Sequence, residues 1–203
     1  MSRLSLATLR QVFAAVEAGF ESTVIWRGGA LDRLLDQRHA GLVAATIALL
    51  RRLDWTVAVE VTYSVYGERG SIDILAVNAA LRIALVIEVK TELTSIEQLG
   101  RKLDEKVRLV HSSLCRERFG WKPIAVGRLV ILPATDTARR AVERNESVLR
   151  VLFPSRGKEV RSWLRKPGGQ LSGLVFVADT NRRSVTGRPP ARSRVRRPRA
   201  SPS

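Results

Sequence analysis

The stretch that decides the fold is GSIDILAVNAALRIALVIEVKTEL, residues 70–93. Its two apolar runs, residues 71–77 and 83–90, are typical of strands meant for burial, and NAALR between them is typical of a hairpin connection. Three charged residues, Asp73, Glu88 and Lys90, nevertheless interrupt the apolar runs. Burying a charge is costly unless it is paired or binds a metal. We therefore expect these three residues to pair with one another or to bind a cation.

The spacing of these residues predicts that they share one face of the hairpin. Glu88 and Lys90 are two apart on a strand and therefore point to the same side. In an antiparallel hairpin the numbers of paired residues have a constant sum. Pairing Asp73 with Glu88 centres the turn between Ala80 and Leu81, inside the expected connection. A shift of two residues keeps this arrangement, whereas a shift of one destroys it.

Two carboxylates close together suit a hard divalent cation such as Mg²⁺ or Mn²⁺. We therefore predict Asp73, Glu88 and the carbonyl of Val89 as metal ligands. Lys90 is expected to orient an attacking water or to stabilise charge that develops on a phosphate, and metal-bound water is the expected nucleophile. Asp73, Glu88 and Lys90 are thus the predicted catalytic residues. The alternative interpretation is a buried ion cluster without a metal.

The triplet SID, fourteen further residues and EVK, within the order α-β-β-β-α-β, resemble the PD-(D/E)xK nuclease superfamily over about residues 36–133. The resemblance implies an α/β fold with a restriction-endonuclease-like core, a mixed central sheet flanked by helices. It also implies that Asp73 and Glu88 bind Mg²⁺ while Lys90 assists hydrolysis of a phosphodiester. Ile72 stands in place of the family's proline. The helix before the first strand often carries an acid, for which Asp36 and His39 are the candidates here.

Further segments, among them WRGGALDRLLDQRH, FPSRGKEVRSWL and SGLVFVAD, resemble a bacterial family whose members are often fused to a helix-turn-helix repressor-type domain. Residues 4–20 resemble only the last helix of such a domain. We therefore expect residues 1–35 to be a helical N-terminal segment, a remnant of that region. Residues 36–180 should form the nuclease-like domain, and residues 181–203 a disordered tail rich in Arg, Pro and Ser.

Hydrophobic periodicity predicts the other elements. A turn is expected at Gly28–Gly29, followed by a short helix, and Val57, Val59 and Val61 are expected to share one face of the first strand. The expected helices are 5–20, 36–53, 95–118, 137–152 and 160–164, and the expected strands are 55–64, 71–77, 83–90, 126–132 and 174–177.

Two accessory candidates have competing interpretations. Gln98 could lie near the metal, but Ser95 followed three residues later by Gln98 is also a capping box, which we favour. Glu60 could reach the site or face solvent, and His39 could be a ligand or a structural histidine.

The net charge of +16 predicts a polyanionic partner, most simply DNA. Half of this charge lies in the tail, whose arginines could contact phosphates in any sequence. These arginines are Arg182, Arg183, Arg188, Arg192, Arg194, Arg196, Arg197 and Arg199. On the helix after the motif, Arg101, Lys102 and Lys106 could also track phosphates, although ordinary pairing with neighbouring acids is a competing account.

The single cysteine precludes an internal disulfide, and no segment has the pattern of a secretory signal or a membrane-spanning helix. A cytoplasmic protein, compatible with a homodimer and without a membrane partner, is therefore expected. Two functions from different classes fit the sequence. One is a Mg²⁺-dependent nuclease acting on DNA. The other is a non-catalytic DNA-binding regulator or scaffold that retains the nuclease fold.

Overall fold

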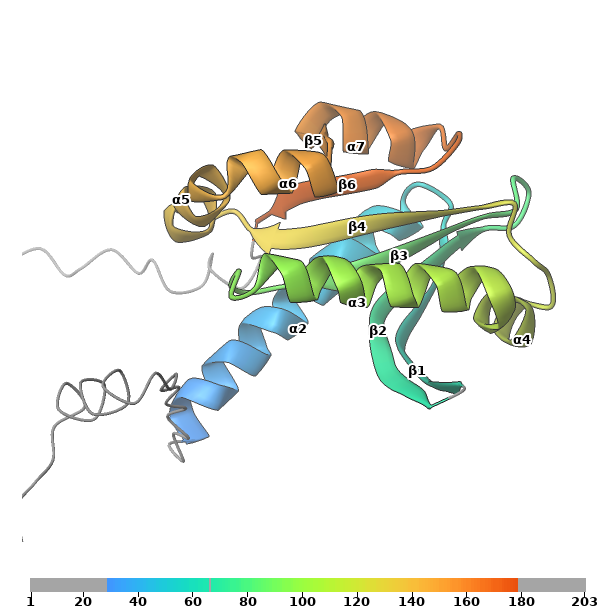
Figure 1. The fold of residues 1–203 in the computed structure, drawn as a ribbon, viewed down its shortest axis with the longest axis horizontal. Coiled ribbons are helices and arrows are strands. Elements are labelled where there is room, and N and C mark those ends of the chain that lie inside the picture. The colour runs from blue at the N-terminus through green and yellow to red at the C-terminus, as the bar shows by residue number, and fades with distance from the viewer. Residues whose placement is uncertain (1–28, 66, 179–203) are drawn as a thin grey trace, which may run out of the picture. The chain divides into compact units, whose positions relative to one another are not determined.

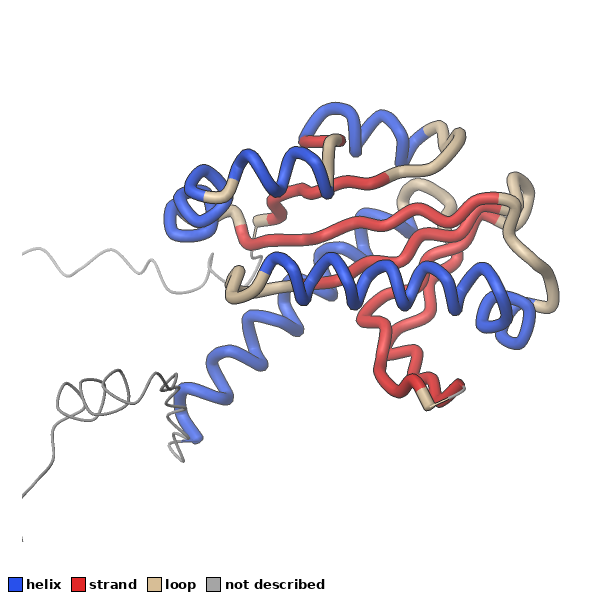
Figure 2. Tube along the Cα trace, in the orientation of Figure 1, coloured by secondary structure: helices blue, strands red, loops and turns tan. Residues whose placement is uncertain are grey.

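A computed structural model describes residues 29–65 and 67–178, which form an α/β structure. Its six-stranded mixed sheet has the order β1-β2-β3-β4-β6-β5 (Figures 1 and 2). The first three strands are antiparallel neighbours, whereas β4, β6 and β5 continue the sheet from β3 in parallel. The strands are β1 Thr56–Val65, β2 Glu68–Asn78, β3 Ile83–Val89, β4 Ala125–Pro133, β5 Ser155–Arg156 and β6 Ser172–Val177.

Helices cover both faces of this sheet, and each face has its own apolar cluster. Leu42 and Leu50 of α2 pack with Val160 of α7 on one face, while Leu103 of α3 and Phe153, which follows α6, pack on the other. All seven residues of β3 are buried, because a strand with both faces covered has no solvent side. The helices are α2 Gly29–Arg51, α3 Ile96–Leu109, the π-helical segment Val110–Leu114, α4 Cys115–Phe119, α5 Asp136–Arg144, α6 Glu146–Leu152 and α7 Gly157–Arg165.

The hairpin of β1 and β2 changes face partway along its length. Val57 packs in the cluster beneath α2, but Val61 packs in the cluster beneath α3. The change occurs at Glu60, whose φ of 49° is a left-handed conformation that is uncommon outside glycine. The pairing of β1 with β2 is regular at Val59↔Ile74 and Val61↔Ile72 but is interrupted between them, at Glu60 and Asp73. The expectation that Val57, Val59 and Val61 share one face was therefore wrong.

Most predicted elements are found within a few residues of their expected bounds. The main differences lie in helices. The predicted turn at Gly29 and the break before residue 36 are replaced by one continuous helix, α2, and the predicted helix 137–152 is divided into α5 and α6. The predicted helix 5–20 and the basic tail lie outside the described residues. Among the helices that are described, none is long and apolar enough to cross a membrane.

Candidate active site

The predicted register of the central hairpin is confirmed. The pairs of β2 with β3 run from Asn78↔Ile83 to Ile74↔Ile87, so the next position in this register would pair Asp73 with Glu88. The regular pairing stops there. Instead, the backbone N–H of Val89 donates to Oδ2 of Asp73 at 2.7 Å. A side-chain carboxylate thus accepts a backbone N–H at the point where β2 bends away from β3.

Glu88 lies at the centre of a buried charge cluster. Its Oε1 is 2.8 Å from Nζ of Lys90, and its Oε2 is 2.5 Å from Nζ of Lys106. The two lysines differ in environment: the side chain of Lys90 is 42% exposed, and that of Lys106 only 7%. Each carboxylate oxygen of Glu88 therefore has its own ammonium partner, one accessible to solvent and one enclosed.

The prediction that Lys106 contacts phosphates from an exposed surface was wrong, because its side chain is buried and paired with Glu88. Leu99, Leu103 and Lys106 are spaced by four and three residues, which puts them on one face of α3. That face is buried against the sheet, and Lys106 with it. An ammonium is tolerated there because Glu88 neutralises it. Sequence analysis missed this role, although the helical spacing from Leu103 was a signal that could have revealed it.

The environment of Asp73 disfavours its charged form. Burial raises the pKa of the Asp73 carboxyl, and the negative charge of Glu88 raises this pKa further. The hydrogen bond from Val89 and the positive charges of Lys106 and His39 act in the opposite direction, and the pKa remains raised. The charge of Glu88 thus reaches the carboxyl of Asp73, so the two side chains lie near each other.

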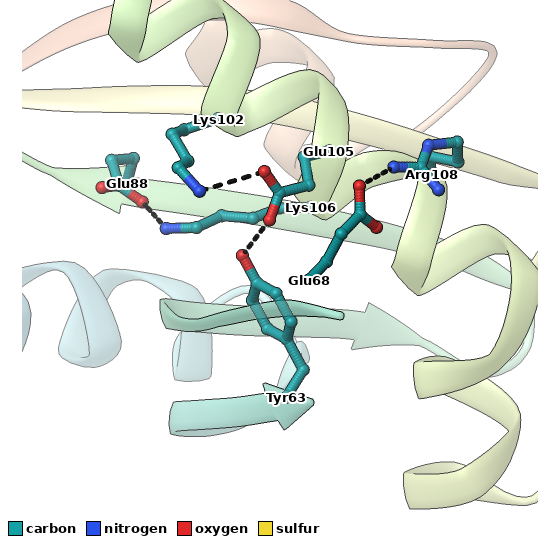
Figure 3. A network of polar contacts seen from close by, with 7 residues as sticks. All are labelled: Tyr63, Glu68, Glu88, Lys102, Glu105, Lys106 and Arg108. Carbon is teal, nitrogen blue, oxygen red and sulfur yellow. Dashed lines mark hydrogen bonds and ion pairs between the residues drawn. The ribbon is translucent and has the colours of Figure 1, made fainter. Parts of the chain in front are cut away.

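A second group of polar contacts, centred on Glu105 of α3, lies next to the cluster of Glu88 (Figure 3). The hydroxyl of Tyr63 donates to Glu105 at 2.9 Å, and Lys102 donates to the other oxygen of the same carboxylate at 3.1 Å. Burial acts to raise the pKa of Glu105, but the hydrogen bonds from Lys102 and Tyr63 prevail and lower it. Burial, and then the bond to Glu105, raise the pKa of Tyr63. Tyr63 therefore serves as a neutral donor that fixes Glu105.

A cavity of about 310 Å³ opens onto this arrangement. Glu88, Lys90 and Lys106 line one part of it, and Ser71 of β2 and Gln98 of α3 line another. Tyr63 and Lys102 also contribute to the wall. Solvent or a bound molecule in this cavity can thus reach the carboxylate of Glu88 and the accessible ammonium of Lys90.

The accessory candidates are distributed unevenly. Ser95 Oγ accepts the backbone N–H of Gln98 at 3.3 Å, which confirms Ser95 as the N-cap of α3, and Gln98 also lines the cavity. His39 on α2 is half-buried and affects the ionisation of Asp73. Asp36 and Glu60 are both exposed.

The basic candidates on α3 differ from one another. Arg101 is exposed, and Lys102 forms its ion pair with Glu105. The role of the tail arginines stays a prediction, because residues 181–203 lie outside the described part of the chain.

The donor set suits a cation held by few protein ligands. Among the side chains that the structure describes, those of residues 35–65 and 67–178, no group of three or more His, Cys, Asp or Glu could hold a metal ion. Two carboxylates, those of Asp73 and Glu88, nevertheless come together, and Mg²⁺ commonly takes one or two carboxylates with water and substrate phosphates as its other ligands. The N–H of Val89 contacts Asp73, and the part assigned to its carbonyl stays a prediction.

Comparisons with known proteins do not assign the chain to a family. A scan against protein-family models finds no match, and no curated protein matches the chain significantly.

Proposed function

We propose that the chain is a Mg²⁺-dependent nuclease with a restriction-endonuclease-like core, which hydrolyses phosphodiester bonds in DNA. One observation carries the proposal. The hairpin register leads to Asp73 and Glu88 as the next positions after its last pair, the N–H of Val89 donates to Asp73 at 2.7 Å, and the ion pair at 2.8 Å joins Lys90 to Glu88. The resemblance of SID and EVK to the PD-(D/E)xK superfamily and the net charge of +16 support the same function.

The residues have separate parts in this proposal. Asp73 and Glu88 would hold the cation, which supplies positive charge to the phosphate oxygens when it is bound. Lys90 is the accessible ammonium, so it can leave Oε1 of Glu88 and donate to a phosphate or to the attacking water. Lys106 is enclosed and stays on Oε2, where it holds the glutamate in place. His39 and Gln98 remain accessory candidates.

Cleavage of plasmid and oligonucleotide DNA in Mg²⁺ or Mn²⁺ tests the proposal. Asp73→Asn and Lys90→Met should each lose cleavage while remaining folded. Lys122→Met, at an exposed lysine with no part in the site, is the matched control and should keep it. Equal cleavage by all four proteins would exclude the assigned residues.

Metal binding gives a second readout that does not depend on turnover. A cation that binds only the folded protein adds about 2.7 kcal/mol of stability at a concentration of one hundred times its Kd. Mn²⁺ should therefore raise the melting temperature of the wild type and of Lys122→Met, but not that of Asp73→Asn. An equal rise in all of them would place the cation elsewhere.

The non-catalytic DNA-binding regulator or scaffold is the second candidate, and one observation favours it. Both oxygens of Glu88 are already neutralised by lysines, and no third acid joins the two carboxylates in the described part of the chain. DNA binding that is salt-dependent, unchanged by Mg²⁺ and unaffected by Asp73→Asn would support this alternative over the nuclease.

A further inference from the structure

A larger cavity, of about 450 Å³, lies outside the charge cluster of Glu88. Its walls come from four parts of the chain: the segment Thr91–Leu93 directly after β3, residues 133 and 135 at the end of β4, one side of α2 and one side of α5. The cavity thus begins one residue after Lys90, at the carboxyl ends of two parallel strands. In open sheets with parallel strands, this edge is the usual place for a ligand.

The lining combines an aliphatic surface with two arginines. Leu42 and Leu93 supply apolar surface, whereas Arg38 and Arg144 bring positive charge from α2 and α5, respectively. Neither arginine forms an ion pair with any residue that the structure describes. Glu92 is the acid in this lining. Two guanidinium groups that form no ion pair among the described side chains, beside aliphatic surface, suit a ligand that has both an anionic and a less polar part.

A nucleotide unit has this combination. Guanidinium groups bind phosphate through paired hydrogen bonds, and the faces of a sugar and base can lie on aliphatic side chains. The volume is within the range of ordinary small-ligand sites, about 300–1,000 Å³. Lys90 lines the smaller cavity and Thr91 lines this one, so consecutive residues of the chain join the two, as a polymer with neighbouring phosphates in both cavities would require.

We infer that this cavity is a nucleotide subsite, in which Arg38 and Arg144 bind a backbone phosphate of the nucleic acid adjacent to the one at Lys90. The inference rests on the proposed nuclease function and adds to it the path of the bound strand. Binding at this subsite requires neither the metal nor turnover, because both phosphate-binding groups are permanently charged.

The test measures binding of a fluorescent forked oligonucleotide, which offers both duplex and single strand, by anisotropy in EDTA over a series of salt concentrations. The full chain carries Asp73→Asn as the non-cutting background. Into it are placed either Arg38→Ala with Arg144→Ala or, as the control, Arg51→Ala with Arg140→Ala. The control removes the same charge from the same two helices, at exposed arginines that do not line the cavity.

Each lost phosphate contact lowers the slope of log K against log salt by about 0.7–0.9. We expect the double variant Arg38→Ala with Arg144→Ala to reduce the magnitude of this slope by about 1.4–1.8 and to weaken binding. The control double variant should change both much less. Melting curves should be alike for the two double variants, so that a loss of binding is not a loss of folding.

The other outcomes overturn the inference in distinguishable ways. If both double variants bind alike, the subsite is excluded while the proposed nuclease function stands. If the background protein fails to bind the oligonucleotide in EDTA and in Ca²⁺, both the subsite and the DNA substrate are excluded.

Discussion

Replacing Lys106 by Met tests whether the enclosed lysine holds the charge cluster together. The change removes the ammonium 2.5 Å from Glu88 but keeps an unbranched side chain of similar length. Removing one partner of a buried ion pair costs about 3–5 kcal/mol, because the other charge is left without compensation. Lys90 remains at 2.8 Å from the other oxygen of Glu88, so we expect a loss near the lower limit, about 3 kcal/mol.

Urea denaturation followed by circular dichroism measures this loss directly. In a domain of about 150 residues, 1 kcal/mol corresponds to roughly 2–4 °C in melting temperature, so the effect should also be clear in a thermal scan. Lys102→Met is the matched control. Its ammonium pairs with Glu105 at 3.1 Å and its side chain is 44% exposed, and an exposed pair contributes about 0–1 kcal/mol.

A double variant separates the ion pair from simple packing. Glu88→Gln leaves the ammonium of Lys106 buried without its counter-charge and should also destabilise the protein. Combined with Lys106→Met, it removes both charges, and the loss should be smaller than the sum of the two single losses. Additive losses, or a Lys106→Met variant no less stable than Lys102→Met, would refute the assignment of Lys106 as the buried counter-charge.

Three further predictions concern other parts of the chain. The folded-state pKa of Asp73 is raised, so its stabilising contribution is present below the unfolded pKa of about 3.9 and is lost as the pH rises through the folded value. Asp73→Asn should therefore have a larger free energy of unfolding than wild type at pH 7, and the difference, measured in urea titrations, should close below that unfolded pKa. A difference that stays constant with pH would contradict this. Gly173→Ala should cost about 1–3 kcal/mol of unfolding free energy, since the added Cβ would lie 2.8 Å from Val160. Gly168→Ala is the control and should be near neutral, because nothing lies within 4 Å of its Cβ. Similar losses in both variants would refute the steric account. Burial raises the pKa of the Cys115 thiol to about 11, so a thiol reagent at pH 8 should label it only as the protein unfolds, and rapid labelling under native conditions would show that the cysteine is accessible.

The hairpin register could be predicted because several signals agreed. The lengths of the two apolar runs and the polar connection between them allow few pairings, and only one parity buries the apolar residues. The end of the regular pairing at Asp73 could not be predicted in the same way. It coincides with a left-handed conformation of Glu60 on the neighbouring strand, where the pairing of β1 with β2 is also interrupted. The residue type at position 60 does not indicate this conformation, since glycine or asparagine would be the usual signal.

The position of Lys106 shows a different limit. Its spacing from Leu99 and Leu103 predicts burial, whereas its charge predicts a solvent-facing residue, and the two signals conflict. The conflict is resolved only in three dimensions, where Glu88 of β3 meets the same face of α3. Because the partners are 18 residues apart on different elements, neither local propensity nor helical periodicity reveals the pair.

The two lysines on Glu88 explain how a charged group can be both part of the core and available for chemistry. Were both enclosed, the carboxylate would be fully compensated, and a cation or phosphate would have to break a buried pair to reach it. Were both exposed, Glu88 would be buried with only weak, solvent-screened partners. With Lys106 at 7% exposure and Lys90 at 42%, one oxygen keeps its counter-charge while the other is accessible from the cavity. A ligand then competes only with Lys90, and the cost of displacing an exposed lysine is small.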